Sequence, residues 1–414
     1  MPDQQKSSDH VRLRYGFLGT DGLFSDAWKM VFEPADADKK RPDAEKKPSS
    51  TVEVAVPGRS GRILGSDSSP PSGSSASVDR RAFLATSSIA AIASLDLVAL
   101  VTPANAPLPT RIRRLDVEQI LAAADEIHRL DNKQGGGGLV GVIAGHAMRW
   151  AVSRLTVPCP EQLKAPLYAA VARLGIVVGA SHFDAYAHDD ARIAFKIAAD
   201  CAEEARDWHL RAKVYSFLAR QAIWVGDPDT GLTYAEKGLV RSDRLTPTIQ
   251  AMLHSARARA FGKLGDVRGT LAAVGAADDA FSKSNPADDP PWMAYYNEAQ
   301  HHGDTAHASW DLAILANQDP ARASHRFEIA VAGHSDDYAR SRAISGTKWA
   351  SLLMAKGDPC QAAAIGHKAL DDAGRLTSRR AADDLTDLSR FTKRHRGLPD
   401  VERLRERIAT TLQA

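Results

Sequence analysis

Aspartates at nearly regular intervals constrain the fold of this chain more than any other feature. They are Asp190, Asp227, Asp266, Asp319 and Asp358, and the intervals between them are 37, 39, 53 and 39 residues. Three of the five follow a Gly, and three are followed by a Pro. Gly favours the left-handed residue that ends a helix, Asp caps the next helix, and Pro fits its first turn. Each aspartate therefore predicts a turn between two helices.

Small residues stand at two fixed distances after each aspartate. Because residues seven apart lie on one face of a helix, two small residues at that spacing let a neighbouring helix approach closely. Four and eleven residues after the aspartates, every position holds Ala, Gly, Thr or Cys: Ala194, Gly231, Thr270, Ala323 and Ala362, then Cys201, Gly238, Ala277, Ala330 and Ala369. A helix, a turn and a helix with small residues at constant offsets are typical of a tetratricopeptide-like array.

The rest of the chain beyond residue 115 also has the pattern of helices. One apolar stripe has spacings of three and four residues and consists of Ile249, Met252, Leu253, Ala256, Ala260, Phe261 and Leu264. Aromatic residues make up only 6% of the chain, and no run of alternating β-branched residues predicts a strand. We therefore expect an all-α fold, a tetratricopeptide-like α-solenoid built as a right-handed array of antiparallel helix pairs, with a disordered N-terminal leader.

Composition divides the chain into four regions. Residues 1–33 contain a short apolar cluster that predicts a small helical remnant. Residues 34–79 are rich in charge, Ser, Pro and Gly, which is typical of a disordered linker. Residues 80–110 are apolar and rich in Ala. Residues 111–414 are expected to form the helical array, which ends in amphipathic capping helices.

The third region begins with a pattern that resembles a twin-arginine export signal. Its residues are Arg80, Arg81, Phe83 and Leu84, and an apolar run follows them. The arginines stand behind 79 other residues, and Asp96 interrupts the apolar run. Both observations favour a helix near a linker in a cytoplasmic protein. A protein that is exported or anchored through the twin-arginine route is the alternative.

Several kinds of chemistry are disfavoured by the sequence. A formal net charge of +2 is too small for the whole chain to act as a polyanion binder. Three cysteines without a CxxC pair favour neither a zinc module nor a disulfide scaffold. The four glycines at 135–138 lack the strand and the Lys-Ser/Thr of a phosphate loop, and no Gly-x-Ser-x-Gly elbow is present. We expect no catalytic residue, no metal and no cofactor, and hence a protein that is not an enzyme.

The 53-residue interval contains the candidate binding residues. A Pro-Pro pair breaks the chain there, and a helix rich in aromatic and polar side chains follows. The first helices of such pairs line a concave groove, so a partner would contact side chains on them. The candidates are Trp292, Tyr295, Glu298 and His302, with Arg342 and Trp349 one repeat later. Glu298 and His302 are one turn apart, but a metal site needs a further ligand, which favours a polar groove surface.

The segment DDPPWMAYYNEAQHHGDTAHASWDLA, at 288–313, resembles part of a known family, as do 113–138, 170–195 and 338–370. The family is the actinobacterial Xre-type helix-turn-helix transcriptional regulators, whose C-terminal region is tetratricopeptide-like. LGTDGLFSDAW, at 18–28, resembles the segment that follows the DNA-binding domain in such regulators. A helix-turn-helix domain needs about 55–60 residues, and fewer than 20 precede Leu18, so we expect no direct DNA binding by this chain.

These patterns together predict a regulatory or interaction protein. Its helical groove would bind a peptide, a protein or a small ligand. The resemblance implies a link to transcriptional or developmental regulation. A second copy of the chain is a further partner that the sequence leaves open.

Overall fold

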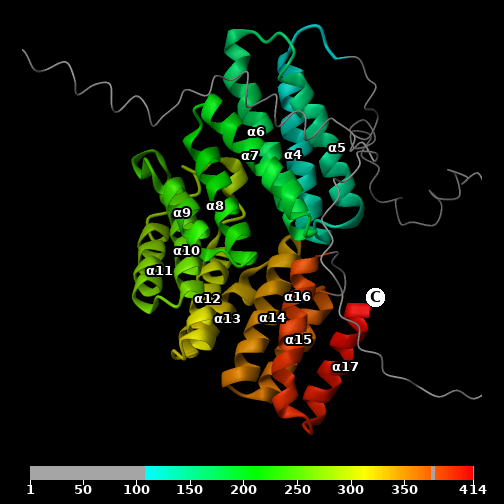
Figure 1. The fold of residues 1–414 in the computed structure, drawn as a ribbon, viewed down its shortest axis with the longest axis vertical. Coiled ribbons are helices and arrows are strands. Elements are labelled where there is room, and N and C mark those ends of the chain that lie inside the picture. Colours follow the sequence, from blue (N-terminus) through cyan, green and yellow to red (C-terminus); the bar gives the residue numbers. More distant parts are fainter. Residues whose placement is uncertain (1–107, 374–377, 414) are drawn as a thin grey trace, which may run out of the picture. The chain divides into compact units, whose positions relative to one another are not determined.

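The computed structural model describes residues 108–373 and 378–413, and this part of the chain is all-helical, without a strand. Figure 1 shows the helices following one another from α4, in cyan, to α17, in red. The expected remnant at 1–33 and the expected linker at 34–79 lie outside the described residues. So do the export-like residues Arg80, Arg81, Phe83 and Leu84.

Fourteen α-helices make up most of the described chain. They are α4 (Arg114–Gln134), α5 (Gly138–Arg154), α6 (Glu161–Asp184), α7 (His188–Glu204), α8 (Trp208–Trp224), α9 (Pro228–Leu239), α10 (Pro247–Leu264), α11 (Val267–Phe281), α12 (Glu298–Leu315), α13 (Ala321–Gly333), α14 (Ala339–Lys356), α15 (Pro359–Ala373), α16 (Arg379–Thr392) and α17 (Pro399–Gln413). Short 3-10 helices connect some of them: η2 (Ser242–Arg244), η3 (Pro291–Met293), η4 (Asp336–Tyr338) and η5 (Lys393–His395).

Consecutive helices pack against each other as pairs. The closest pairs are α6 with α7, α8 with α9, α10 with α11, α12 with α13, and α14 with α15. The first helix of one pair also packs against the first helix of the next, as α10 does with α12 and α14 with α16. The same set of first helices therefore forms a continuous layer through the described chain.

Two of the aspartate turns have the predicted geometry. Asp227 accepts a hydrogen bond from the Thr230 amide at 3.1 Å, and Asp266 accepts one from the Gly269 amide at 2.8 Å. The residues before them, Gly226 and Gly265, have positive φ values of 91° and 75°. A side-chain cap of this kind satisfies one of the free amides at the start of a helix.

Other turns differ from the prediction. Asp190 lies inside α7, which begins at His188, because the left-handed residue that follows α6 is Tyr186, with φ 66°. Gly357 has φ −132°, so it does not end α14 in the left-handed conformation. Asp358 nevertheless accepts a hydrogen bond from the Cys360 amide at 2.8 Å, as a residue before a helix does.

The ten small residues that follow the aspartates are all buried. A Cβ atom added to Gly231 would lie 2.6 Å from Ile223, and one added to Gly238 would lie 2.5 Å from Leu253. These positions are therefore small because a neighbouring helix leaves no room for a side chain. In the apolar stripe on α10, Leu264 differs from the prediction, since it is 46% exposed at the end of the helix.

One described helix, α6, is long and apolar enough to cross a membrane. In the structure it packs against α4, α5, α7 and α8, and most of its apolar stretch is buried among them. Its composition is thus also that of a core helix, which is hydrophobic on most of its circumference.

Candidate ligand-binding cavity

A cavity of about 120 Å³ lies among the first helices. Its wall contains side chains from α4, α6, α8, α10, α12, α14 and α16, together with η3 and the residues that follow it. These seven helices are called the lining helices below. Since a cavity needs only about 10–15 Å³ by this measure to hold one water molecule, this one has room for a small organic molecule.

Aromatic side chains form much of the apolar wall. They are Phe183, Phe217, Trp224, Trp292, Tyr295 and Tyr338. Tyr295 donates a hydrogen bond from its hydroxyl to the sulfur of Met252 at 3.1 Å, which fixes the ring against α10. Planar rings held in this way give a ligand a rigid apolar surface to pack against.

The charged side chains of the cavity are mostly cations. One carboxylate, Asp304, lines it, against six basic groups: Arg173, Lys213, Arg220, Arg259, Arg340 and Arg380. Four of the six have acidic partners, in the pairs Arg173–Asp125, Arg220–Asp304, Arg340–Asp131 and Arg380–Asp184. The other two, Lys213 and Arg259, have no ion-pair partner in the described part of the chain.

Lys213, on α8, is 6% exposed. Its ammonium nitrogen lies 3.4 Å from the centre of the Tyr295 ring, a cation–π contact. Within residues 108–373 and 378–413 it has neither a hydrogen-bond nor an ion-pair partner. Burial lowers the pKa of Lys213 well below its usual value, and the nearby Arg220 and Arg173 lower it further. The charged form of this side chain is therefore poorly satisfied in the empty cavity.

Arg259, on α10, is the second cation without a partner. Its Nε atom is buried and makes no hydrogen bond in the described part of the chain. Burial lowers the pKa of its guanidinium, and Arg220 acts in the same direction. Asp304, Asp311 and Asp384 act in the opposite direction on Arg259, so only Lys213 has surroundings that are mainly positive.

Buried ion pairs join the beginning and the end of the described chain beside this cavity. Asp184, at the end of α6, is completely buried and accepts hydrogen bonds from Ser378, from Arg380 and from the Gly136 amide, at 2.9, 2.8 and 2.9 Å. Burial raises the pKa of Asp184, but Arg380 and Arg340 outweigh burial and lower it. The glycine loop at 135–138 is thus fixed by a carboxylate, and α6 is tied to α16.

The structure brings only some of the expected groove residues to this cavity. Trp292 and Tyr295 line it. Glu298 and His302 do not; Glu298 has a side chain that is 75% exposed, and its carboxylate lies 4.0 Å from His302. These two side chains leave α12 on a different side from Gly303 and Asp304, which line the cavity.

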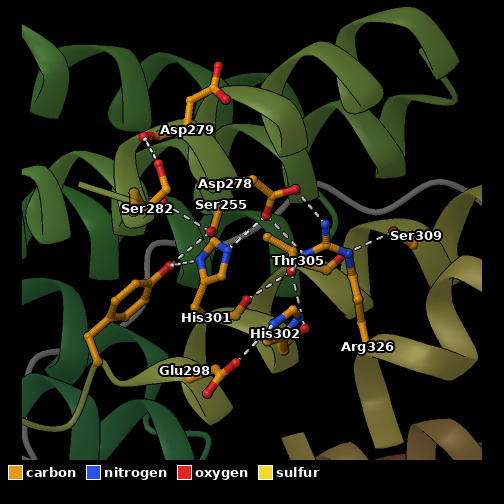
Figure 2. Close-up of polar contacts among 12 residues, drawn as sticks. Ser255, Asp278, Asp279, Ser282, Glu298, His301, His302, Thr305, Ser309 and Arg326 are labelled. Atoms are coloured by element: carbon orange, nitrogen blue, oxygen red, sulfur yellow. Dashed lines mark hydrogen bonds and ion pairs between the residues drawn. The ribbon is translucent and has the colours of Figure 1, made fainter. Parts of the chain in front are cut away.

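The surroundings of His302 contain a compact polar network. Figure 2 shows His301 and Arg326 meeting at the carboxylate of Asp278. His301 Nε2 lies 2.8 Å from Asp278, and Arg326 donates to Asp278 at 2.5 Å and to Thr305 at 2.7 Å. Burial raises the pKa of Asp278, but the hydrogen bonds from His301 and Arg326 outweigh burial and lower it to about 2. This network ties α11, α12 and α13 together, and its charged groups have partners.

Arg342 and Trp349 lie elsewhere, at a separate cavity of about 470 Å³ formed by α13, α14 and α15. Arg342 donates to Asp372 at 2.7 Å, and Trp349 donates from its indole nitrogen to Ser324 at 2.8 Å. Both side chains are half-buried and hydrogen-bonded. The six expected residues are therefore distributed over three places.

The cations of the cavity were not among the residues predicted from the sequence. On α8, the lining residues recur at spacings of three and four: Leu210, Lys213, Phe217, Arg220 and Trp224. These spacings mark one face of a helix. Two cations inside a stripe of apolar and aromatic residues are the signal that could have located the site.

Among the described residues, no group of three or more His, Cys, Asp or Glu side chains has the arrangement of a metal site. Comparisons of the chain with protein-family models, with curated proteins and with solved structures returned no match. The function is therefore inferred from the cavity itself.

Proposed function

We propose that this protein is a regulatory binding protein whose lining helices enclose a small ligand. In this proposal residues 111–414 form a tetratricopeptide-like array, and the cavity takes the place of its concave groove. The single observation that supports the proposal most is the cavity, which combines an aromatic wall with buried basic groups that have no partner. Such a combination of apolar surface and a few convergent polar groups is typical of a ligand site.

Binding without catalysis fits the residues of the cavity best. Of the described side chains that line it, no serine hydroxyl is hydrogen-bonded to a histidine. Nucleophilic catalysis needs such a nucleophile and base within reach of each other. The resemblance of the chain to Xre-type regulators supports a regulatory role in the cytoplasm, in which the bound ligand alters contacts with a protein partner.

The ion pairs beside the cavity suggest how a ligand would alter the protein. Arg340, on α14, pairs with Asp131 on α4 and also lines the cavity. Arg380, on α16, pairs with Asp184 on α6 and lines it too. A ligand that competes for these arginines would therefore change the contact of α14 with α4 and that of α16 with α6.

The test is calorimetric titration of the chain with 2-naphthamide, a planar molecule without charge. We expect saturable binding of one molecule per chain. The variant Ala180→Phe places a ring in the cavity from α6 and should abolish binding, whereas Ala122→Phe, at an exposed position of α4, should leave binding unchanged. Equal binding by wild type and Ala180→Phe would show that the cavity is not the ligand site.

A further inference from the structure

We propose that the ligand of this cavity is an anion, a small molecule whose carboxylate or phosphate pairs with Lys213 while its planar or apolar body packs on the aromatic wall. This inference rests on the proposed function and adds the chemical class of the ligand.

Lys213 is a buried cation without a partner in the described chain. An ammonium group in a protein interior is costly unless it is paired and hydrogen-bonded. Lys213 is 6% exposed and, within the described chain, contacts aromatic rings but no carboxylate and no hydrogen-bond acceptor. An anion in the cavity would supply the partner that the fold withholds.

The charges around Lys213 are mainly positive. Arg173 on α6 and Arg220 on α8 both act on its ammonium group as like charges. The carboxylate Asp304, on α12, is already bound by Arg220 and by the amide of Gln300, the latter at 3.0 Å. The field that remains in the cavity favours a negative group.

The wall near Lys213 is aromatic. Trp292 and Phe217 flank its ammonium nitrogen, with ring centres 5.8 and 5.4 Å away, beyond the closer ring of Tyr295. An anion placed at Lys213 would thus have aromatic surfaces beside it. This arrangement favours a ligand that joins the anionic group to a planar or apolar body over a bare inorganic ion.

The experiment compares two molecules of the same shape, 2-naphthoate and 2-naphthamide, by calorimetric titration of the whole chain. We expect 2-naphthoate to bind about 10- to 100-fold more tightly, as charge-assisted hydrogen bonds at a buried site would provide. The variant Lys213→Met keeps the length of the side chain and removes its charge. We expect this variant to lose most of the preference for the anion while it still binds the neutral amide.

Two further variants complete the design. Arg259→Met, which removes a basic group of the same cavity that has carboxylates near it, should reduce the preference less than Lys213→Met does. Lys196→Met, at an exposed position of α7, should leave it unchanged. A third titrant, 2-naphthyl phosphate, assigns the ligand class, because tighter binding than 2-naphthoate points to a phosphate and weaker binding to a carboxylate.

The possible failures separate the two proposals. Equal affinity of the wild type for 2-naphthoate and 2-naphthamide would overturn the proposal of an anionic ligand. The proposal that the cavity binds a ligand would remain. A preference for 2-naphthoate that survives in Lys213→Met would also overturn the proposal of an anionic ligand. If the protein binds neither 2-naphthoate nor 2-naphthamide, the proposed function itself is contradicted.

Discussion

Two lysines in this protein are buried to nearly the same degree in regions with opposite charge. Lys213, in the ligand cavity, is 6% exposed, and Lys348, on α14, is 9% exposed. Each ammonium group lies over an aromatic ring, that of Tyr295 at 3.4 Å and that of Trp310 at 4.4 Å. Lys348, however, pairs with Asp384 at 2.8 Å and has Asp387 at 3.6 Å, whereas Lys213 pairs with no acid in the described chain.

The difference shows in the pKa of each group. Burial lowers the pKa of Lys348, but Asp384 and Asp387 outweigh burial and raise it. For Lys213, burial is the largest cause and the neighbouring arginines add to it, so its pKa falls. A buried charge with a partner maintains the fold, while a buried charge without one destabilises the fold and is available to a ligand.

The largest effect is expected at Lys348. Lys348→Met leaves Asp384 buried without its partner, which should lower the free energy of unfolding by about 3–5 kcal/mol. Urea unfolding followed by circular dichroism measures the change. The double variant Lys348→Met/Asp384→Leu removes both charges and should recover most of the loss. A loss below about 1 kcal/mol in the single variant would mean that the ion pair is not maintained in solution.

Lys213→Met should act in the opposite direction. Because it removes a buried charge that has no partner, we expect the ligand-free protein to gain about 1 kcal/mol of stability. The same urea unfolding experiment applies, with Lys196→Met as the exposed control, for which a change within about 0.5 kcal/mol is expected. Destabilisation by Lys213→Met would show that the cation–π contact with Tyr295 outweighs the cost of burial.

The stability gain of Lys213→Met should depend on pH. The folded pKa of Lys213 is lowered, so between that pKa and the usual 10.5 the unfolded chain holds more protons, and the stability of the wild type rises with pH. The charged and titratable groups near Lys213 are Arg173, Arg220, Asp304, His128 and Tyr295. The gap between wild type and variant should therefore narrow from pH 7 to pH 10 in urea titrations. A constant gap would contradict the lowered pKa.

The smallest effect concerns His128, which lines the cavity from α4. Burial lowers its pKa to about 3, and Lys213, Arg340 and Arg173 contribute in that order. Such a histidine is neutral in the folded protein. Its contribution to the free energy of unfolding is therefore complete above pH 6.5 and is lost as the pH falls towards 3. In Lys213→Met the pKa of His128 should rise by a fraction of a unit, measurable from its imidazole NMR shifts. An unchanged pKa of His128 would show that Lys213 is too far away to act on this histidine.

Much of the local structure could be predicted from the sequence. Asp227 and Asp266 cap their helices and the ten small residues are buried, because capping and helical periodicity depend on residues within about one or two turns. The start of α7 was placed wrongly, since Tyr186 adopted the left-handed conformation that was expected of a glycine. For the site, the sequence located Trp292 and Tyr295 but neither of the unpaired cations.

The sequence by itself determined that the described chain is a succession of helices, and which of their faces are apolar. Only the tertiary structure decided which charges have partners. Arg340 pairs with Asp131 from 209 residues away, and Arg380 binds Asp184 from 196 residues away. Lys213 and Lys348 both lie on buried faces of their helices, and helical periodicity does not predict which of them has a partner. Their roles differ because α16 brings Asp384 to Lys348, whereas the helices around Lys213 bring mainly arginines and aromatic rings.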